Sequence, residues 1–211
     1  MRVGPRSRVA AAVALAVAGI LAAGCAWSPG ATEPLATPES SQPVGPFAHN
    51  SGMSFPETAG RFVRSDVTRF DKAGDDVAAN YDTDRTRPIV ATVYVYPMGT
   101  GTGYNVSGFL CQHEFDGIID TILKRPDARE PRVIERKAVV LREAGNRHDG
   151  NVARFEYESS RDYGPVPVRS EMYLFCVNGK WFIEYRFTYP RALDASADIA
   201  EFMEQLVWGI K

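Results

Sequence analysis

The stretch VRSEMYLFCVNGKWFIEYRFTY, residues 168–189, decides the fold. Two runs of β-branched, aromatic and apolar residues flank Asn-Gly, the preferred pair for the type I′ turn of a β-hairpin. A two-residue turn places Cys176 opposite Trp181, on a nearly apolar side that is expected to face the core. The same register places Glu171 opposite Arg186, on a side that is expected to be partly exposed.

Other strand patterns precede this hairpin. Residues 61–70 and 77–81 alternate moderately, and residues 133–142 and 152–158 follow later in the chain. Residues 89–96, IVATVYVY, are apolar or aromatic at nearly every position, which predicts a strand buried on both faces.

Two segments have helical periodicity instead. Residues 107–125 carry one apolar stripe, and Pro126 ends the segment. Residues 196–210 carry a second stripe and begin with residues that can cap a helix. The apolar stripes consist of Cys111, Phe115, Ile118, Ile119 and Ile122 in the first segment, and of Ile199, Phe202, Met203, Leu206, Val207 and Ile210 in the second.

The predicted order is therefore three strands, a helix, four strands and a helix. Runs of strands interrupted by single helices indicate an α+β fold, with a largely antiparallel sheet of six to seven strands flanked by two helices. This order resembles the Mog1/PsbP-like α/β/α sandwich over most of residues 55–211. The resemblance has no signature motif, so it assigns no functional residue, and it implies an accessory or binding protein rather than an enzyme.

The start of the chain has the pattern of an export signal. Arg2, Arg6 and Arg8 precede an uninterrupted small and apolar run at residues 9–23. A run of about fifteen residues is too short to cross a hydrocarbon core of about 30 Å. The pattern predicts a cleavable signal rather than a membrane helix.

Residues 21–25, LAAGC, resemble the lipobox of bacterial lipoproteins. The resemblance implies that a diacylglyceryl group is attached to Cys25, that residues 1–24 are removed, and that the lipid is the membrane contact. The sequence departs from the usual lipobox at Ala22, where leucine is common, so an ordinary signal with an incidental cysteine is the alternative. Ala26 is not aspartate, which by the family's sorting rule favours the outer membrane in a cell with two membranes.

The composition restricts the partners of the mature chain. Without residues 1–24 the chain has 21 basic and 26 acidic residues, a net charge of −5. This balance argues against nucleic acid as a partner and against a polybasic membrane patch. Residues 25–51 are rich in Pro, Ser and Thr and predict a tether, which leaves residues 52–211 as a single domain.

The remaining two cysteines lie at predicted core positions. Cys111 is on the apolar stripe of the first helix, and Cys176 is on the core side of the hairpin. Two interpretations stay open: a disulfide that closes a loop of about 65 residues and contributes about 2–4 kcal/mol, or two buried free thiols. The sequence lacks the Cys-x-x-Cys spacing that would indicate a redox role.

No cofactor or metal motif is apparent. His49, His113 and His148 are scattered, and His113 points about 200° away from Cys111 on a helix, so no zinc site is expected. His113 and Glu114 are expected on the solvated helix surface. The Gly-rich residues 99–103 lack the spacing of a nucleotide-binding loop, although their amides could bind a small anion.

No catalytic residue stands out, and three functions remain open. The preferred hypothesis is a non-catalytic envelope lipoprotein whose domain binds or supports another envelope component, such as a protein. The second is a small hydrolase or transferase that acts on cell-wall or lipid material. The third is a binder of small ligands through the Gly-rich loop. An enzyme requires a nucleophile or base with a partner about 2.6–3.2 Å away.

Overall fold

The computed structural model describes residues 39–41, 45–86, 88–99, 106–143, 145–159, 166–206 and 208–209. Within these residues there are eleven strands and two helices. In chain order they are β1 (Glu39–Ser41), β2 (Phe47–Ala48), β3 (Ser54–Phe55), β4 (Thr58–Ala59), β5 (Phe62–Arg69), β6 (Val77–Asp82), β7 (Val90–Pro97), α1 (Val106–Leu123), β8 (Ala128–Glu143), β9 (Asn146–Ser159), β10 (Val166–Val177), β11 (Trp181–Pro190) and α2 (Ser196–Gln205).

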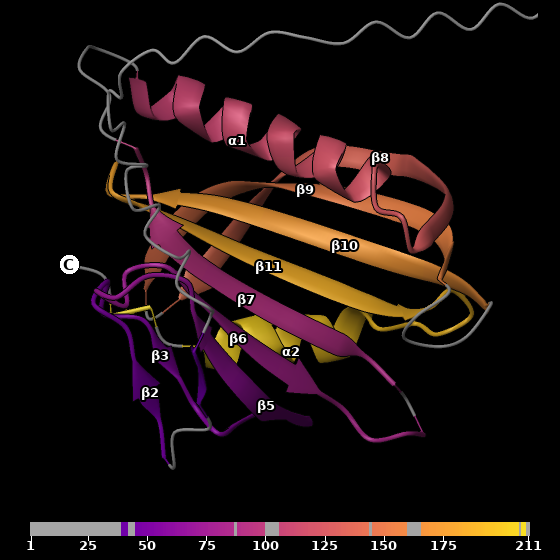
Figure 1. Ribbon diagram of the computed structural model, residues 1–211, viewed down its shortest axis with the longest axis horizontal. Helices are drawn as coiled ribbons and strands as arrows, with labels where there is room; N and C mark the ends of the chain where they lie inside the picture. Colours follow the sequence, from indigo (N-terminus) through magenta and orange to yellow (C-terminus); the bar gives the residue numbers. More distant parts are fainter. Residues whose placement is uncertain are drawn as a thin grey trace, which may run out of the picture. The chain divides into compact units, whose positions relative to one another are not determined.

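Eight strands form one antiparallel sheet in the order β1-β5-β6-β7-β11-β10-β9-β8. The short strand β4 pairs with β5 outside this path, and β2 and β3 form a separate small sheet. The prediction of an α+β fold with an antiparallel sheet and two helices is confirmed, although the main sheet has more strands than expected. Figure 1 shows the two long hairpins, β8–β9 and β10–β11, side by side.

The turn between β10 and β11 has the predicted type but a longer loop. Asn178 and Gly179 have φ angles of 53° and 63°, as a type I′ turn requires. Lys180 does not join the ladder: its amide donates the turn hydrogen bond of 3.0 Å to the Val177 carbonyl oxygen, and its carbonyl accepts a hydrogen bond of 2.7 Å from the amide of Met98. The ladder therefore resumes with Val177 paired to Trp181.

This extra loop residue shifts the register by one, so the predicted cross-strand partners were wrong. Glu171 pairs with Phe187 rather than with Arg186, and Cys176 pairs with Phe182 rather than with Trp181. A one-residue shift regroups the side chains of the two faces. The side that carries Glu171 is consequently buried, not partly exposed as expected.

The two helices pack against opposite faces of the sheet, as the alternation of buried side chains shows. In Figure 1, α1 lies along β8 to β10 on one face of the sheet, and α2 lies behind the sheet. The buried α2 residues Ile199, Phe202 and Met203 join a large aromatic core that also contains Tyr185 and Phe187. The α1 core is smaller, and its main members are Phe115, Ile118, Ile119, Ile122, Phe155, Met172, Leu174 and Phe182.

Strand β7 is fully buried on one face only, which corrects the prediction of two buried faces. Ala91, Val93 and Val95 are buried on the α2 side, whereas Tyr94 and Tyr96 on the other side are half-buried. The reason is that α1 contacts β8 and β10 and leaves part of the β6–β7 surface uncovered.

Both ends of the folded region differ from prediction. Strands β1 and β2 lie within residues 25–51, which were expected to be a tether, so ordered structure begins before residue 52. Helix α2 ends at Gln205 rather than at residue 210, because Leu206 has an extended backbone. The shorter helix lets Trp208 fold back into the core, where its Nε1 donates a hydrogen bond of 2.6 Å to Tyr185.

Among the described residues, no helix is both long and apolar enough to span a membrane.

Candidate functional site

A buried carboxylate, that of Glu171 on β10, lies on the α2 face of the sheet. Its side chain is 5% exposed, although its neighbours on this face are mostly aromatic and aliphatic. An ionised carboxylate is costly to bury unless hydrogen bonds and an opposite charge compensate. The neighbouring strands provide that compensation.

Three donors surround Glu171. Oε2 accepts hydrogen bonds from Arg154 Nε at 3.0 Å and from the Tyr173 hydroxyl at 2.7 Å. Oε1 accepts a short hydrogen bond from the Tyr189 hydroxyl. Arg154 also donates to Glu135 on β8, so the network joins four strands.

Three members of the network, Arg154, Tyr173 and Tyr189, have raised pKa values. Burial is the largest cause that raises the pKa of the Tyr173 and Tyr189 hydroxyls above their usual value, and the charge of Glu171 and the hydrogen bonds to it raise the pKa further. Partial burial lowers the pKa of Arg154, but its bonds to Glu171 outweigh this effect and raise the pKa overall. At neutral pH the tyrosines are therefore donors and Arg154 is a cation.

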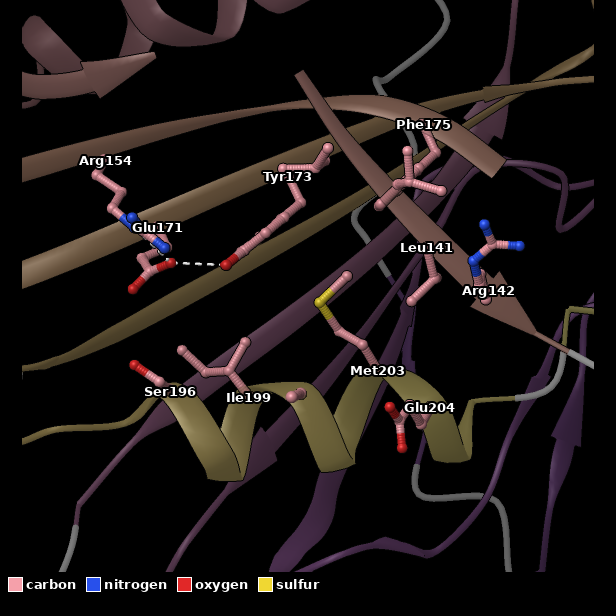
Figure 2. Close-up of a pocket in the computed structure, with 13 residues that line it drawn as sticks. Leu141, Arg142, Arg154, Glu171, Tyr173, Phe175, Ser196, Ile199, Met203 and Glu204 are labelled. Carbon is pink, nitrogen blue, oxygen red and sulfur yellow. Dashed lines mark hydrogen bonds and ion pairs between the residues drawn. The ribbon is translucent and has the colours of Figure 1, made fainter. Parts of the chain in front are cut away.

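A cavity of about 430 Å³ opens beside this network, between α2 and strands β8 to β10. Figure 2 shows Arg154, Glu171 and Ser196 at one end and Arg142 and Glu204 at the other. The middle is apolar and is lined by Val139, Leu141, Phe175, Ile199, Ala200 and Met203.

A second hollow of about 380 Å³ continues from the polar end of this cavity. The two share Arg154, Glu171 and Ser196, and the second extends toward Arg169 and Tyr189. Cavities of this size and mixed lining are typical of sites for small molecules. The arrangement can hold an elongated molecule whose apolar part lies along α2 and whose polar group contacts Arg154 or Glu171.

Among the described residues, the cavity lining includes neither histidine nor cysteine. Ser196 has a hydroxyl group, and its amide donates a hydrogen bond of 3.1 Å to Asp194 at the start of α2. In the described part of the chain, no group of three or more His, Cys, Asp or Glu side chains could hold a metal ion. The lining of the cavity thus combines charged, hydroxyl and apolar groups that can contact a bound molecule.

Comparisons with protein-family models and with curated protein sequences find no match to this chain.

The two core cysteines are bonded to each other. Cys111 of α1 and Cys176 of β10 form a disulfide, with their Cα atoms 6.0 Å apart. The bond ties α1 to the centre of the sheet and selects one of the two interpretations left open by the sequence. Cys25, the predicted lipid attachment site, lies outside the described residues, as do residues 100–103 of the Gly-rich loop.

The histidines lie in three different environments. His113 is exposed, as predicted, and stacks on Phe109. His148 belongs to β9, not to a loop, and its ring packs on Trp208. Glu114, which was expected on the solvated surface with His113, is half-buried and accepts a hydrogen bond of 2.8 Å from Tyr96.

His49 is the histidine whose surroundings the sequence did not reveal. It is buried, its Nδ1 lies 2.8 Å from Ser51 Oγ, and its Nε2 lies 3.1 Å from the carbonyl oxygen of Asp75. Burial lowers the pKa of His49. The amide of Ser51 also donates to Nδ1 at 3.0 Å, and the amide of Met53 donates to Ser51 Oγ at 3.2 Å, so the pair closes a local turn.

Sequence reasoning missed Glu171 and Arg154 as site residues. The available signal was a glutamate inside a strand run, followed directly by the apolar and aromatic residues 172–177. Such a glutamate is either an edge residue or a buried, compensated charge, and only the correct register separates the two cases.

Proposed function

We propose that this chain is an exported lipoprotein whose folded domain binds an amphiphilic small molecule in the cavity between α2 and strands β8 to β10. The cavity, with an apolar middle and the Arg154–Glu171–Tyr173 network at one end, is the observation that carries the proposal. An acyl or similar apolar chain fits the lining by Leu141 and Met203, and a polar group fits the network.

The cell envelope is the proposed location, with lipid on Cys25 as the anchor. The lipobox resemblance supports this part of the proposal. The negative charge of the mature chain agrees with it, because a chain that is not attracted to the membrane by basic residues depends on its lipid for membrane contact. The disulfide between Cys111 and Cys176 adds support, since such bonds persist mainly outside the reducing cytoplasm.

The arrangement of two helices on opposite faces of an antiparallel sheet is in keeping with a Mog1/PsbP-like sandwich. That likeness favours a binding or accessory role over catalysis, and a ligand held in the cavity could be presented to an envelope protein. It remains a likeness of architecture and carries no residue assignment.

A small hydrolase is the second candidate, and the His49–Ser51 pair is the observation that favours it. The distance of 2.8 Å between Ser51 Oγ and His49 Nδ1 suits a nucleophile and its base. The backbone bonds described above already explain the pair, and neither residue lines the cavity beside Glu171. Covalent labelling of Ser51 by a fluorophosphonate probe would favour the hydrolase.

Binding is tested with dansyl-labelled undecanoic acid, excited directly at the dansyl group. We expect saturable binding of the probe to the wild-type domain. Its affinity should fall by about tenfold or more in Ala200→Phe, because Ala200 is an exposed residue of α2 that lines the cavity and a phenylalanine there narrows it. Ala197→Phe is the matched control, because Ala197 is exposed on the same helix and does not line the cavity. Equal binding by the two variants would refute the cavity as the site.

The anchor has a separate test. Cys25→Ala should abolish metabolic labelling by a palmitate analogue and move the protein to the soluble fraction. Membrane retention of the unlabelled variant would contradict anchoring through Cys25.

A further inference from the structure

Another hollow lies on the opposite face of the sheet, where α1 leaves part of β7 and β11 uncovered. It has a volume of about 520 Å³ and lies between the flank of α1, the surface of β7 and β11, and the segment between β5 and β6 that carries Phe70 and Asp76. Its polar and aromatic lining comes from Asp76, Tyr94, Tyr96, Glu114, Glu184 and Arg186. None of these residues takes part in the Glu171 network, so the two sites are chemically independent.

Glu184 is the central group of this hollow. The residue is 2% exposed, and its Oε1 accepts a short hydrogen bond from Arg186 Nε. For Oε2, the described part of the chain offers only the Tyr96 hydroxyl, at 3.5 Å. That hydroxyl lies closer to Glu114, at 2.8 Å, and a hydroxyl has a single proton to donate. A buried carboxylate oxygen in the lining is thus left with unused acceptor capacity.

The charges of the lining are also unbalanced. Three carboxylates, those of Asp76, Glu114 and Glu184, face one guanidinium, that of Arg186. Burial raises the pKa of Glu184, and burial followed by the charge of Asp71 raises the pKa of Asp76. Burial is the largest cause of both shifts; Arg186 lowers the pKa of Glu184, whereas the neighbouring carboxylate of Glu114 raises it further.

The walls of the hollow suit a cation with an organic body. The Arg186 guanidinium already lies 4.9 Å from the centre of the Tyr94 ring, and the Tyr96 ring extends the aromatic surface. Aromatic faces attract ammonium and guanidinium groups, and carboxylates accept their charge-assisted hydrogen bonds. A bare metal ion fits less well, because no group of described side chains has a ligand set for one.

We propose that this hollow is a second binding site that takes an organic cation with a primary ammonium or guanidinium group. Glu184 Oε2 and Glu114 accept the N–H groups of the cation, and the rings of Tyr94 and Tyr96 contact its organic part.

Three probes of nearly equal shape test the proposal by isothermal titration calorimetry: phenethylamine, 2-phenylethanol and phenylacetate. The amine should bind roughly tenfold or more tightly than the alcohol, because the alcohol lacks the charge, and phenylacetate should not bind. Binding of the alcohol or of phenylacetate as tight as that of the amine would overturn the proposal, as would no binding of the amine.

Variants locate the site. Glu184→Gln should weaken amine binding by about tenfold or more. Because that change also removes the partner of Arg186, a second variant leaves all charges in place. Gly117 lies on the flank of α1 that lines the hollow, and a Cβ there meets no atom within 4 Å, so Gly117→Leu should fill the hollow in a folded protein.

Gly108→Leu is the matched control. Gly108 also lies on α1 in open space, away from the hollow. Amine binding that survives in Gly117→Leu, or that is lost equally in Gly108→Leu, would contradict the assignment. Dansyl-undecanoate binding should be unchanged in Gly117→Leu, which separates failure of this proposal from failure of the cavity at α2.

Discussion

The Tyr173 hydroxyl donates a hydrogen bond of 2.7 Å to Glu171, two residues earlier on the same strand. Both side chains lie on the α2 face, because residues two apart on a strand share a face. This hydrogen bond holds the Glu171 carboxylate at the polar end of the cavity in Figure 2. There the Arg154 guanidinium supplies the opposite charge that compensates the buried carboxylate. Two of the residues that compensate the buried charge, Arg154 and Tyr173, thus also line the cavity.

Removal of the carboxylate should lower stability. Glu171→Ala removes the acceptor of two tyrosine hydroxyls and one of the two carboxylate partners of Arg154. It should reduce the free energy of unfolding by about 3 kcal/mol, a value at the low end for a buried pair because Arg154 is partly exposed and keeps its bond to Glu135. Urea denaturation followed by circular dichroism measures the change. Glu158→Ala on β9 is the control, since its pair with Arg129 is exposed and should contribute less than about 1 kcal/mol. Equal effects would show that the network is not compensating a buried charge.

Replacement of two glycines by alanine should change the free energy of unfolding in opposite directions. At Gly150 of β9 a Cβ would lie 2.5 Å from Phe175 Cδ1 and 2.6 Å from the Leu174 carbonyl oxygen, so Gly150→Ala should cost about 2–3 kcal/mol. At Gly117 a Cβ meets nothing, so Gly117→Ala should stabilise α1 by about 0.5–1 kcal/mol. Thermal unfolding of both variants checks the signs. A neutral result at Gly150 would mean that β9 and β10 are not in such close contact.

The disulfide should contribute measurably to stability. Its loop spans 65 residues in sequence, and the double variant Cys111→Ser/Cys176→Ser should lose about 2–4 kcal/mol relative to the oxidised wild type. Adding a reductant to the wild type should give a similar loss, whereas the double variant should not respond. A wild type indifferent to reductant would contradict the bond.

The burial of His49 should make the stability of the domain depend on pH. Burial lowers its pKa below 6.5 in the folded protein. Between that lowered value and about 6.5 the unfolded chain binds the proton and the folded chain does not, so the free energy of unfolding decreases as the pH falls through this range. The contribution is fully present above about pH 6.5. His49→Gln should lack this dependence, and the exposed His113→Gln should retain it; the same pH profile in wild type and His49→Gln would count against a buried neutral His49.

Much of the fold was predictable because long patterns determine it. The helical stripe of Cys111, Phe115, Ile118 and Ile122 and the continuous apolar and aromatic run that forms β7 each involve many residues that agree. The strand order in the sheet and the pairing of β7 with β11 depend on contacts distant in sequence, which periodicity does not contain.

The errors have local causes. The register of the main hairpin depends on whether Lys180 joins the ladder, and the Asn-Gly pair alone does not determine this. The end of α2 depended on burial of Trp208 against Tyr185, a distant contact. The short strands β1 to β4 have two or three residues each, too few for any period to appear.

The candidate site was less predictable than the fold, because a site consists of relations between strands. Glu171 and Arg154 are unremarkable as isolated letters, and they form a network only when β9 and β10 pair in the observed register, with Arg154 opposite Glu171. The hollow beside Glu184 likewise exists because α1 covers one part of the sheet and leaves another open.

Native mass spectrometry of the full-length protein, extracted from the envelope in mild detergent, tests the central claim most directly. The wild type and Ala197→Phe should each carry an additional bound mass that fragments as an amphiphile, and Ala200→Phe should carry markedly less of it. An identical bound fraction in Ala200→Phe, or no amphiphile on any of the three proteins, would contradict a ligand-binding cavity beside Glu171.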